Sequence, residues 1–268
     1  MNIILIGISL IIIVIIIIIL YLNNSNSNSN SNSNSNSNSN DYLAYYTYFI
    51  GTDSNPAFRI PPLPSNKYDC YYFTNNENLL KEIKKTIWIP IFIDIKTTKE
   101  DDFIRANMIG KHIKAKPHEY KELKKYKYLC FLDSKLNKLN ENIIENLIFD
   151  KFINGNYAII LRKHTFLDNN IWSEFKESIK YHERYRYEKD KYLNYIDKQL
   201  NNGLKEITDV HCQCGLIIRY MKHKKINDIN NTWYSHIQEC GIHDQISFFF
   251  VKQLFEGYYN AFTENPFL

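Results

Sequence analysis

The chain has 268 residues, with 33 lysines and arginines against 29 aspartates and glutamates, and a formal net charge of +4. This charge is too small to indicate a nucleic-acid-binding protein, and the lysines are spread among glutamates, as on an ordinary solvated surface. The sequence also lacks a glycine-rich phosphate loop, H-E-x-x-H and G-x-S-x-G, which removes the usual signatures of nucleotide hydrolases, metalloproteases and serine hydrolases.

The first 22 residues are almost wholly isoleucine, leucine and valine, and they contain no charged side chain. About 20 apolar residues span a bilayer, and the run from Leu10 to Ile19 has no polar face that would suit a soluble helix. A basic n-region and a small-residue cleavage site are both missing, which favours an uncleaved signal anchor over a removed signal peptide. We therefore predict a single-pass membrane protein held through residues 3–22, with its C-terminal domain luminal or extracellular.

A serine-asparagine repeat at residues 23–40 follows the apolar segment. It has nothing apolar to bury, so we predict a disordered polar stalk without chemistry of its own. The remaining residues, 41–268, suffice for one α/β domain with a substantial core.

Strands and helices alternate along this domain. Apolar and aromatic runs predict strands at 45–50, 68–74, 88–95, 128–132, 157–161 and 215–220. Helices are predicted at 76–87, 101–113, 140–152, 172–200 with at least one break, 232–238 and 243–255. Asn76 is a candidate helix cap, and Pro90 makes its strand an edge or irregular strand. The alternation predicts a mostly parallel sheet covered by helices on both faces.

The stretch KYKYLCFLDSKL, residues 125–136, contains the predicted central strand, Tyr128 to Leu132. Asp133 follows directly, at the carboxyl end of the strand, where ligands bind in open α/β sheets. An ionised carboxylate at that edge can bind a cation or a polar ligand. The alternative is that Asp133 only caps the next turn, because Asp-Ser is ordinary turn chemistry.

Three further groups of residues can carry chemistry. Cations on and after the helix that precedes the central strand could hold phosphates, or could form a solvated helix face: Arg105, Lys111, Lys114, Lys116 and His118. The closing helix begins with His243, Asp244 and Gln245, which predict a helix cap. Alternatively, the helix N-terminus keeps the carboxylate of Asp244 ionised so that it can orient a hydroxyl or bind a metal.

The third group has zinc-type ligands: His211, Cys212, Cys214, Cys240 and His243. C-x-C on a strand is not a usual zinc-knuckle spacing, so zinc is the weaker reading. Buried thiols are favoured, or a disulfide if the domain is luminal.

Eight blocks of sequence occur in a characteristic order: YYTYFIG, YDCYYFTNN, KAKPHEY, YLCFLDSKL, LRKHTF, GLIIRYMKH, NNTWYSHI and HDQISFFFV. In this order they resemble the glycosyltransferase-like family of plant mucilage-related and turgor-regulation proteins, which has bacterial and viral relatives. The resemblance covers about Tyr45 to Gln253, and the last three blocks are its most specific part.

This resemblance implies a membrane-anchored glycosyltransferase of GT-A type, with a Rossmann-like sheet. It would move a sugar, as a hexosyltransferase does, from a nucleotide-sugar donor to a glycan, protein or lipid acceptor. Asp133 would be the aspartate of the metal-binding Asp-x-Asp motif and would hold Mn²⁺ or Mg²⁺ with the donor diphosphate. Lys135 stands at the third position of that motif, so metal dependence is in doubt, and Lys135 could neutralise the diphosphate instead.

The resemblance also suggests roles for the other groups. Asp244, Gln245 and His243 would lie in the acceptor or donor-sugar pocket, with Asp244 as the base of an inverting reaction. The nucleotide side would hold the predicted cations Arg105, Lys111, Lys114 and His118, and Arg219 and His164 would line the site. His243 stands where the family typically has arginine, so a catalytically degenerate glycan- or nucleotide-binding module is the alternative. A hydrolase ranks lower, because the sequence offers no nucleophile–base pair.

Overall fold

The computed structural model describes residues 41–55 and 60–268, which belong to one compact unit. The predicted membrane anchor and stalk, residues 1–22 and 23–40, lie outside the described residues. Within the described part of the chain, no helix has both the length and the apolar character needed to cross a membrane.

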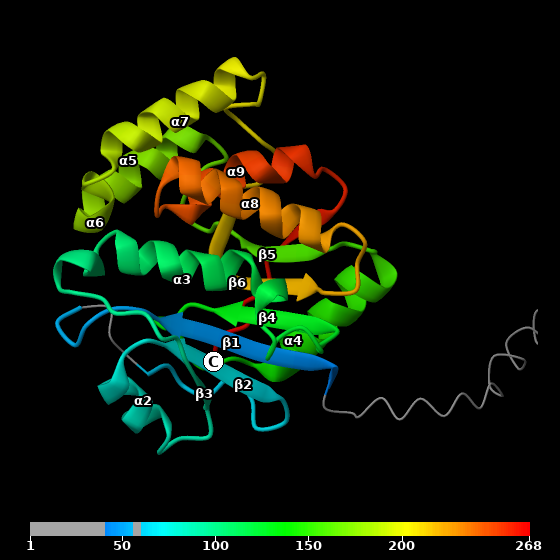
Figure 1. The fold of residues 1–268 in the computed structure, drawn as a ribbon. Helices are drawn as coiled ribbons and strands as arrows, with labels where there is room; N and C mark the ends of the chain where they lie inside the picture. The colour runs from blue at the N-terminus through cyan, green and yellow to red at the C-terminus, as the bar shows by residue number, and fades with distance from the viewer. Residues whose placement is uncertain (1–40, 56–59) are drawn as a thin grey trace, which may run out of the picture. The chain divides into compact units, whose positions relative to one another are not determined.

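A mixed seven-stranded sheet forms the centre of this unit (Figure 1). Its strands are β1 (Leu43–Phe49), β2 (Asp69–Thr74), β3 (Ile89–Phe92), β4 (Tyr128–Leu132), β5 (Ile159–Lys163), β6 (Cys212–Tyr220) and β7 (Tyr259–Phe262). Their spatial order is β3-β2-β1-β4-β6-β5-β7, in which β6 runs antiparallel to β4 and β5 while the other pairs are parallel. The predicted mostly parallel sheet, with β3 at an edge and β4 in the centre, is confirmed.

The helices are α2 (Glu77–Ile83), α3 (Arg105–Ala115), α4 (Glu141–Leu147), α5 (Ile171–Tyr181), α6 (Glu183–Arg186), α7 (Lys189–Asn201), α8 (Ile226–Cys240) and α9 (Asp244–Leu254). A π-helical segment, η5 (Ile148–Asn154), continues α4, and two short 3₁₀ helices are η3 (Glu100–Asp102) and η4 (Pro117–Glu119). Asn76 caps α2 as predicted, because its side-chain oxygen accepts a hydrogen bond from the Leu79 N–H at 2.8 Å.

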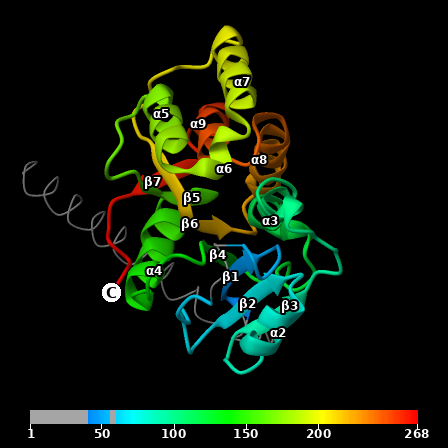
Figure 2. The same ribbon diagram turned by 90° about the vertical axis from the view of Figure 1, so that its left-hand side faces the viewer.

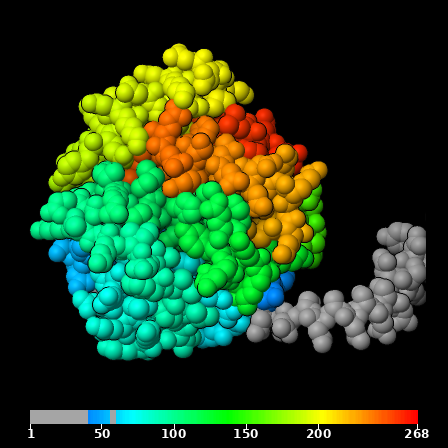
Figure 3. All heavy atoms as spheres, in the orientation of Figure 1, coloured from blue at the N-terminus to red at the C-terminus, as the bar shows by residue number. Residues whose placement is uncertain are grey.

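Both faces of the sheet are covered, as the alternation of strands and helices predicted (Figure 2). Strand side chains point alternately to the two faces, so Leu129 and Phe131 of β4 join a core with α3, α8 and α9, and Tyr128 and Cys130 join a core with α2 and α4. The space-filling view shows α3 and α8 side by side on one surface of the molecule (Figure 3). A third apolar cluster joins α5, α6 and α7 to the outer side of α9.

The structure departs from the predicted elements at several points. The helix α2 ends at Ile83, and Ile87, expected on its buried face, is 65% exposed. The helix expected from residue 101 is divided into η3 and α3. The strand β6 is not the last strand, because the chain turns after α9 and adds β7, whose four residues are too few to show a periodic pattern.

The strand order reverses between β1 and β4. The chain passes from β1 to β2 and β3 on one side, whereas β4 is followed in space by β6 and β5 on the other. Connections that diverge in this way open a crevice at the carboxyl ends of the two strands, where open α/β sheets bind ligands. The fold therefore places the end of β4, and with it Asp133, at the position expected for a ligand.

Candidate functional site

A hollow of about 60 Å³ lies at this reversal, and we call it the switch-point hollow. It is lined by Tyr48, Phe49, Ile50, Asn55, Ala106, Asn107, Lys111, Phe131, Asp133, Ser134, Lys135 and Arg184. Two of the predicted site residues, Asp133 and Lys135, thus come together with one predicted cation, Lys111.

Asp133 occupies a turn at the end of β4. Its backbone N–H donates to the Gly215 carbonyl at 2.8 Å, and its Oδ1 accepts from the Lys135 N–H at 3.0 Å. The second contact is the turn chemistry that formed the alternative reading of Asp-Ser. The turn is thus present, and the same carboxylate lines the hollow, so its binding of a ligand stays a prediction.

Arg184 of α6 is a residue of the switch-point hollow that the sequence did not reveal. Its guanidinium donates to the Tyr185 hydroxyl at 2.9 Å. Burial lowers the pKa of Arg184, but the interaction with Tyr185 and the nearby carboxylate of Asp133 outweigh burial and raise it, so the side chain stays cationic. Arg184 lies 51 positions after Asp133 in a helical stretch, and no motif connects the two. Only the packing of α6 brings them together.

Asp244 is buried between two lysines of α3. Its Oδ1 lies 2.8 Å from Nζ of Lys111, and its Oδ2 pairs with Nζ of Lys114. Burial alone would raise the pKa of Asp244, but the two ammonium groups hold it well below its usual range. The pKa of Lys111 is raised, because the attraction to Asp244 outweighs burial. A carboxylate stabilised in this way is a poor proton acceptor, which argues against Asp244 as the catalytic base.

Three other predicted site residues line neither the switch-point hollow nor any other hollow described below. Arg105 begins α3 with an exposed side chain, paired with Asp101 at 2.9 Å. His118, at η4, lies 3.3 Å from the side-chain amide of Asn230. Arg219 has no exposed surface.

Arg219 joins four elements from inside the core. Its guanidinium donates to the Asn230 side chain at 3.0 Å, to the Tyr46 hydroxyl at 2.9 Å and to the Lys114 carbonyl at 2.9 Å. Asn230 belongs to an Asn-Asn-Thr sequon, yet it is fully buried in α8 and therefore closed to glycosylation in the folded domain.

A second hollow, of about 330 Å³, lies beside α5, and we call it the His–Glu hollow. It is lined by His164, Phe166, Leu167, Glu174, Glu177, Ser178, Tyr181, His182, Tyr185, His243 and Gln245. His164, His243 and Gln245, three predicted site residues, therefore gather here and not around Asp133.

Glu174 is the centre of the His–Glu hollow. Its Oε2 accepts from His211 Nε2 at 2.7 Å and from Gln245 Nε2 at 2.9 Å, and its Oε1 lies 3.1 Å from His243 Nε2. Burial would raise the pKa of Glu174, but its contacts with His211 and His243 hold the pKa well below the usual range. His243 and Gln245 thus contact the carboxylate of Glu174. Asp244, which lies between them in the sequence, pairs instead with the lysines of α3.

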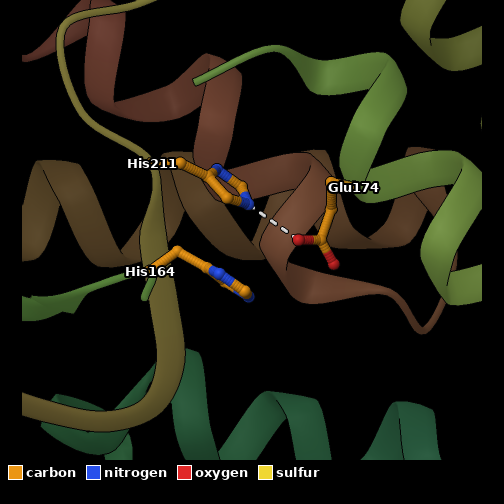
Figure 4. Close-up of side chains that lie close together, drawn as sticks. All are labelled: His164, Glu174 and His211. Atoms are coloured by element: carbon orange, nitrogen blue, oxygen red, sulfur yellow. Dashed lines mark hydrogen bonds and ion pairs between the residues drawn. The ribbon is translucent and has the colours of Figure 1, made fainter. Parts of the chain in front are cut away.

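His164, Glu174 and His211 form the group of described residues whose ligand atoms could surround a metal ion, within 4.8 Å of one another. Figure 4 shows the three side chains converging from separate segments of the chain. His164 Nδ1 accepts hydrogen bonds from the N–H groups of Phe166 and Leu167, at 3.2 and 2.9 Å. The proton of this imidazole is therefore on Nε2, whereas a metal needs the lone pair there. The geometry favours a hydrogen-bonded cluster over a metal centre.

The five cysteines are all buried and free. Among the described residues, no potential metal-binding group includes a cysteine. The prediction of buried thiols is confirmed, and neither the C-x-C zinc site nor the disulfide forms.

A third hollow, of about 210 Å³, adjoins the other two. It shares Asn55, Asn107, Lys135 and Arg184 with the switch-point hollow, and Tyr181 and His182 with the His–Glu hollow. The segment from Tyr181 to Arg184, between α5 and α6, therefore lies along all three.

No family model and no curated protein matches the chain. Among solved structures it is similar to mouse xyloside xylosyltransferase 1, with 11% identity and a TM-score of 0.46 over 83% of this chain and 85% of that one. It is similar to the bifunctional glycosyltransferase WbbM, with 13% identity and a TM-score of 0.43 over 84% of this chain and 39% of that one. It is also similar to the mannosyltransferase Ktr4p from S. cerevisiae, with 14% identity and a TM-score of 0.37 over 77% of this chain and 65% of that one. At these values the similarities say nothing about this chain's substrate.

Proposed function

We propose that this chain is a glycosyltransferase that binds the diphosphate of a nucleoside-diphosphate sugar at the switch-point hollow and transfers the sugar to a glycan, protein or lipid acceptor. The charge at the carboxyl ends of β1 and β4 carries this proposal. Three cations, Lys111, Lys135 and Arg184, line the hollow with one carboxylate, Asp133. Cations at this edge suit the negative charge of a diphosphate.

Lys135 and Arg184 are the cations best placed for the diphosphate. They line both the switch-point hollow and the third hollow, so a bound diphosphate would lie between them. The planar fork of an arginine suits phosphate oxygens, and a lysine supplies a compact charge. When the bond between the sugar and the diphosphate breaks, negative charge develops on the leaving oxygen, and cations already in place stabilise it.

Mg²⁺ is commonly held by one or two carboxylates together with substrate phosphates and waters. The cations that surround the single carboxylate of this hollow favour a donor site in which protein side chains carry most of the charge. Asp133 is the carboxylate that lines the hollow, and Lys111, Lys135 and Arg184 line it too. We propose that Asp133 holds Arg184 by charge, and that Lys135 and Arg184 neutralise the diphosphate.

The test is thermal unfolding of the full chain with UDP, GDP and their sugars, each with Mn²⁺ or with EDTA. A ligand at 100 times its dissociation constant stabilises a protein by about 2.7 kcal/mol. We expect stabilisation by one nucleotide in EDTA, and its loss in the double variant Lys135→Ala and Arg184→Ala. Lys121→Ala is the matched control, because that side chain is 90% exposed and does not line the hollow.

Two results would change the proposal. Stabilisation that needs Mn²⁺ and disappears in Asp133→Ala would restore the metal-dependent reading. A folded chain that no nucleotide stabilises would contradict the donor site.

A catalytically degenerate binding module is the second candidate. The pairing of Asp244 with two lysines favours it, because that carboxylate is not poised to accept a proton. Such a module would bind the nucleotide sugar without consuming it. Release of free nucleoside diphosphate from a labelled donor, measured in the presence of acceptors, separates the two candidates.

We also propose that residues 3–22 anchor the chain in a membrane, with the domain luminal or extracellular. The support is the length and apolarity of that segment. Retention in the membrane pellet after alkaline carbonate washing tests the anchor, and protection of the domain from added protease in sealed vesicles tests its side.

A further inference from the structure

We infer that the His–Glu hollow binds a sugar ring, and that the acceptor of the proposed transfer is therefore a saccharide. Phe166 and Tyr181 would contact the faces of the ring, and the polar groups around Glu174 would bind its hydroxyls. The acceptor role rests on the proposed function, because it requires a donor at the switch-point hollow. The sugar-binding site itself stands on the geometry of the His–Glu hollow.

Two exposed aromatic side chains line the His–Glu hollow. Phe166 is 89% exposed and Tyr181 is 63% exposed. Large aromatic surfaces gain free energy when they leave water, so exposed rings beside a cavity indicate a ligand that covers them. The C–H faces of a sugar ring pack on aromatic rings, whereas its hydroxyl groups still need polar partners.

The lining of the hollow supplies both a hydrogen-bond donor and a hydrogen-bond acceptor for those hydroxyl groups. His164 Nδ1 accepts hydrogen bonds from the backbone N–H groups of Phe166 and Leu167. The ring proton is therefore on Nε2, which can donate a hydrogen bond to a ligand. Burial lowers the pKa of His164, which keeps this ring neutral near physiological pH. Glu177 offers a carboxylate in the same lining. A hydroxyl both donates and accepts, and it can therefore use both kinds of group.

His243 also lines the hollow and has an unsatisfied buried polar atom. The side chain is 3% exposed and stacks on Tyr185 with 4.2 Å between ring centroids. Within the described residues, its Nδ1 has no hydrogen-bond partner. A buried polar atom without a partner is costly. This atom has no accessible surface, so a sugar in the hollow would contact the groups named above and not His243 Nδ1.

The size and lining of the hollow select a saccharide over other acceptors. Its volume of about 330 Å³ is near the low end of the ~300–1,000 Å³ range of small-molecule sites. Leu167 is the one aliphatic residue of its lining, so the hollow offers little to a lipid chain. Because Tyr181 and His182 also line the third hollow, a sugar bound here would lie on the side that faces Lys135 and Arg184.

The test is saturation-transfer NMR on the full chain with the methyl glycosides of glucose, galactose, mannose and xylose, without nucleotide. We expect saturation of at least one glycoside. Loss of one aromatic contact should weaken its binding about threefold to tenfold in Phe166→Ala and in Tyr181→Ala. Phe149→Ala is the matched control, because Phe149 is also exposed and does not line the hollow.

The inference would be overturned if none of the four glycosides showed saturation transfer. It would also be overturned if Phe166→Ala and Phe149→Ala weakened glycoside binding equally. Nucleotide stabilisation, measured on the same variants, separates this failure from that of the proposed function. Phe166→Ala should leave nucleotide stabilisation unchanged, since Phe166 does not line the switch-point hollow. If the chain bound a nucleotide but transferred sugar only to a peptide or a lipid, the inference of a saccharide acceptor would be wrong. The proposed donor site would remain supported.

Discussion

Asp244, the first residue of α9, forms a buried ion pair with Lys111 of α3, with 2.8 Å between Oδ1 and Nζ. Lys114, one turn later in α3, pairs with the other carboxylate oxygen. The three charges join α9 to α3, and Lys111 also lines the switch-point hollow. Both lysines depend on this single carboxylate as their ion-pair partner among the described residues.

Replacing Asp244 should therefore destabilise the domain strongly. Asp244→Asn leaves two buried lysines without their counter-charge, and breaking a buried pair from one side costs about 3–5 kcal/mol. Chemical denaturation of the full chain measures the change in the free energy of unfolding. Asp101→Asn, which removes the partner of the exposed Arg105, is the control and should cost less than ~1 kcal/mol. Similar losses for both variants would contradict a structural role of the buried pair.

Stability should fall in acid for the same reason. The pKa values of Asp244 and Glu174 are lowered in the folded domain, so the unfolded chain binds more protons as the pH falls. The stabilisation is complete above the unfolded values, about 3.9 for Asp and 4.3 for Glu, and is lost progressively below them. Urea midpoints between pH 7 and pH 3 measure this loss, and Asp244→Asn should reduce its slope. An unchanged slope in that variant would assign the acid sensitivity to other groups.

Arg219 should behave as a core residue and not as a nucleotide ligand. In Arg219→Lys the fork that reaches Asn230, Tyr46 and the Lys114 carbonyl is lost, and a lysine cannot replace its planar geometry. We expect a loss of about 2–4 kcal/mol in the free energy of unfolding, from unpaired buried groups. The nucleotide affinity of the folded fraction should be unchanged. A stable variant with weakened nucleotide binding would return Arg219 to the binding site.

Gly51, just after β1, should not tolerate a side chain. Its φ is +142°, and an added Cβ would lie 2.7 Å from Oδ1 of Asp102, which accepts from the Thr52 N–H at 2.8 Å. Gly203 is a matched control, because its φ is +88° and nothing lies within 4 Å of the added Cβ. Gly203→Ala should cost about 1–2 kcal/mol from backbone strain alone, and Gly51→Ala should cost more. Equal melting temperatures for the two variants would exclude the steric contribution.

The five thiols should be unreactive in the folded domain. All are buried, and burial raises the pKa of Cys70 to about 12 and that of Cys212 to about 11. The thiolate is the reactive form, so a disulfide reagent at pH 8 should modify these cysteines only as fast as the domain unfolds. Fast modification of the native chain by two or more equivalents would show that some thiols are accessible.

Local pattern was enough to predict most of the secondary structure. The run from Tyr128 to Leu132 is short and wholly apolar or aromatic, which predicts a buried central strand. Pro90 cannot donate a backbone hydrogen bond, which predicts that β3 lies at an edge of the sheet. The end of α2 was predicted four residues too late, and the four-residue strand β7 was not predicted. Helix ends and very short strands have no hydrophobic period that the sequence could reveal.

The sequence alone also placed Asp133 at the carboxyl end of the central strand, and it offered a cap or an ionised carboxylate at His243, Asp244 and Gln245. The tertiary structure decided which contacts these residues make. Packing of α9 against α3 turns Asp244 toward Lys111, and the fold of α5 and α6 brings Glu174 and Arg184 to the two hollows. A helix period tells which residues share a face, but charges and hydrogen bonds between distant elements depend on which elements become neighbours in space. That choice is made by the packing of the whole core, and it cannot be read from any single segment.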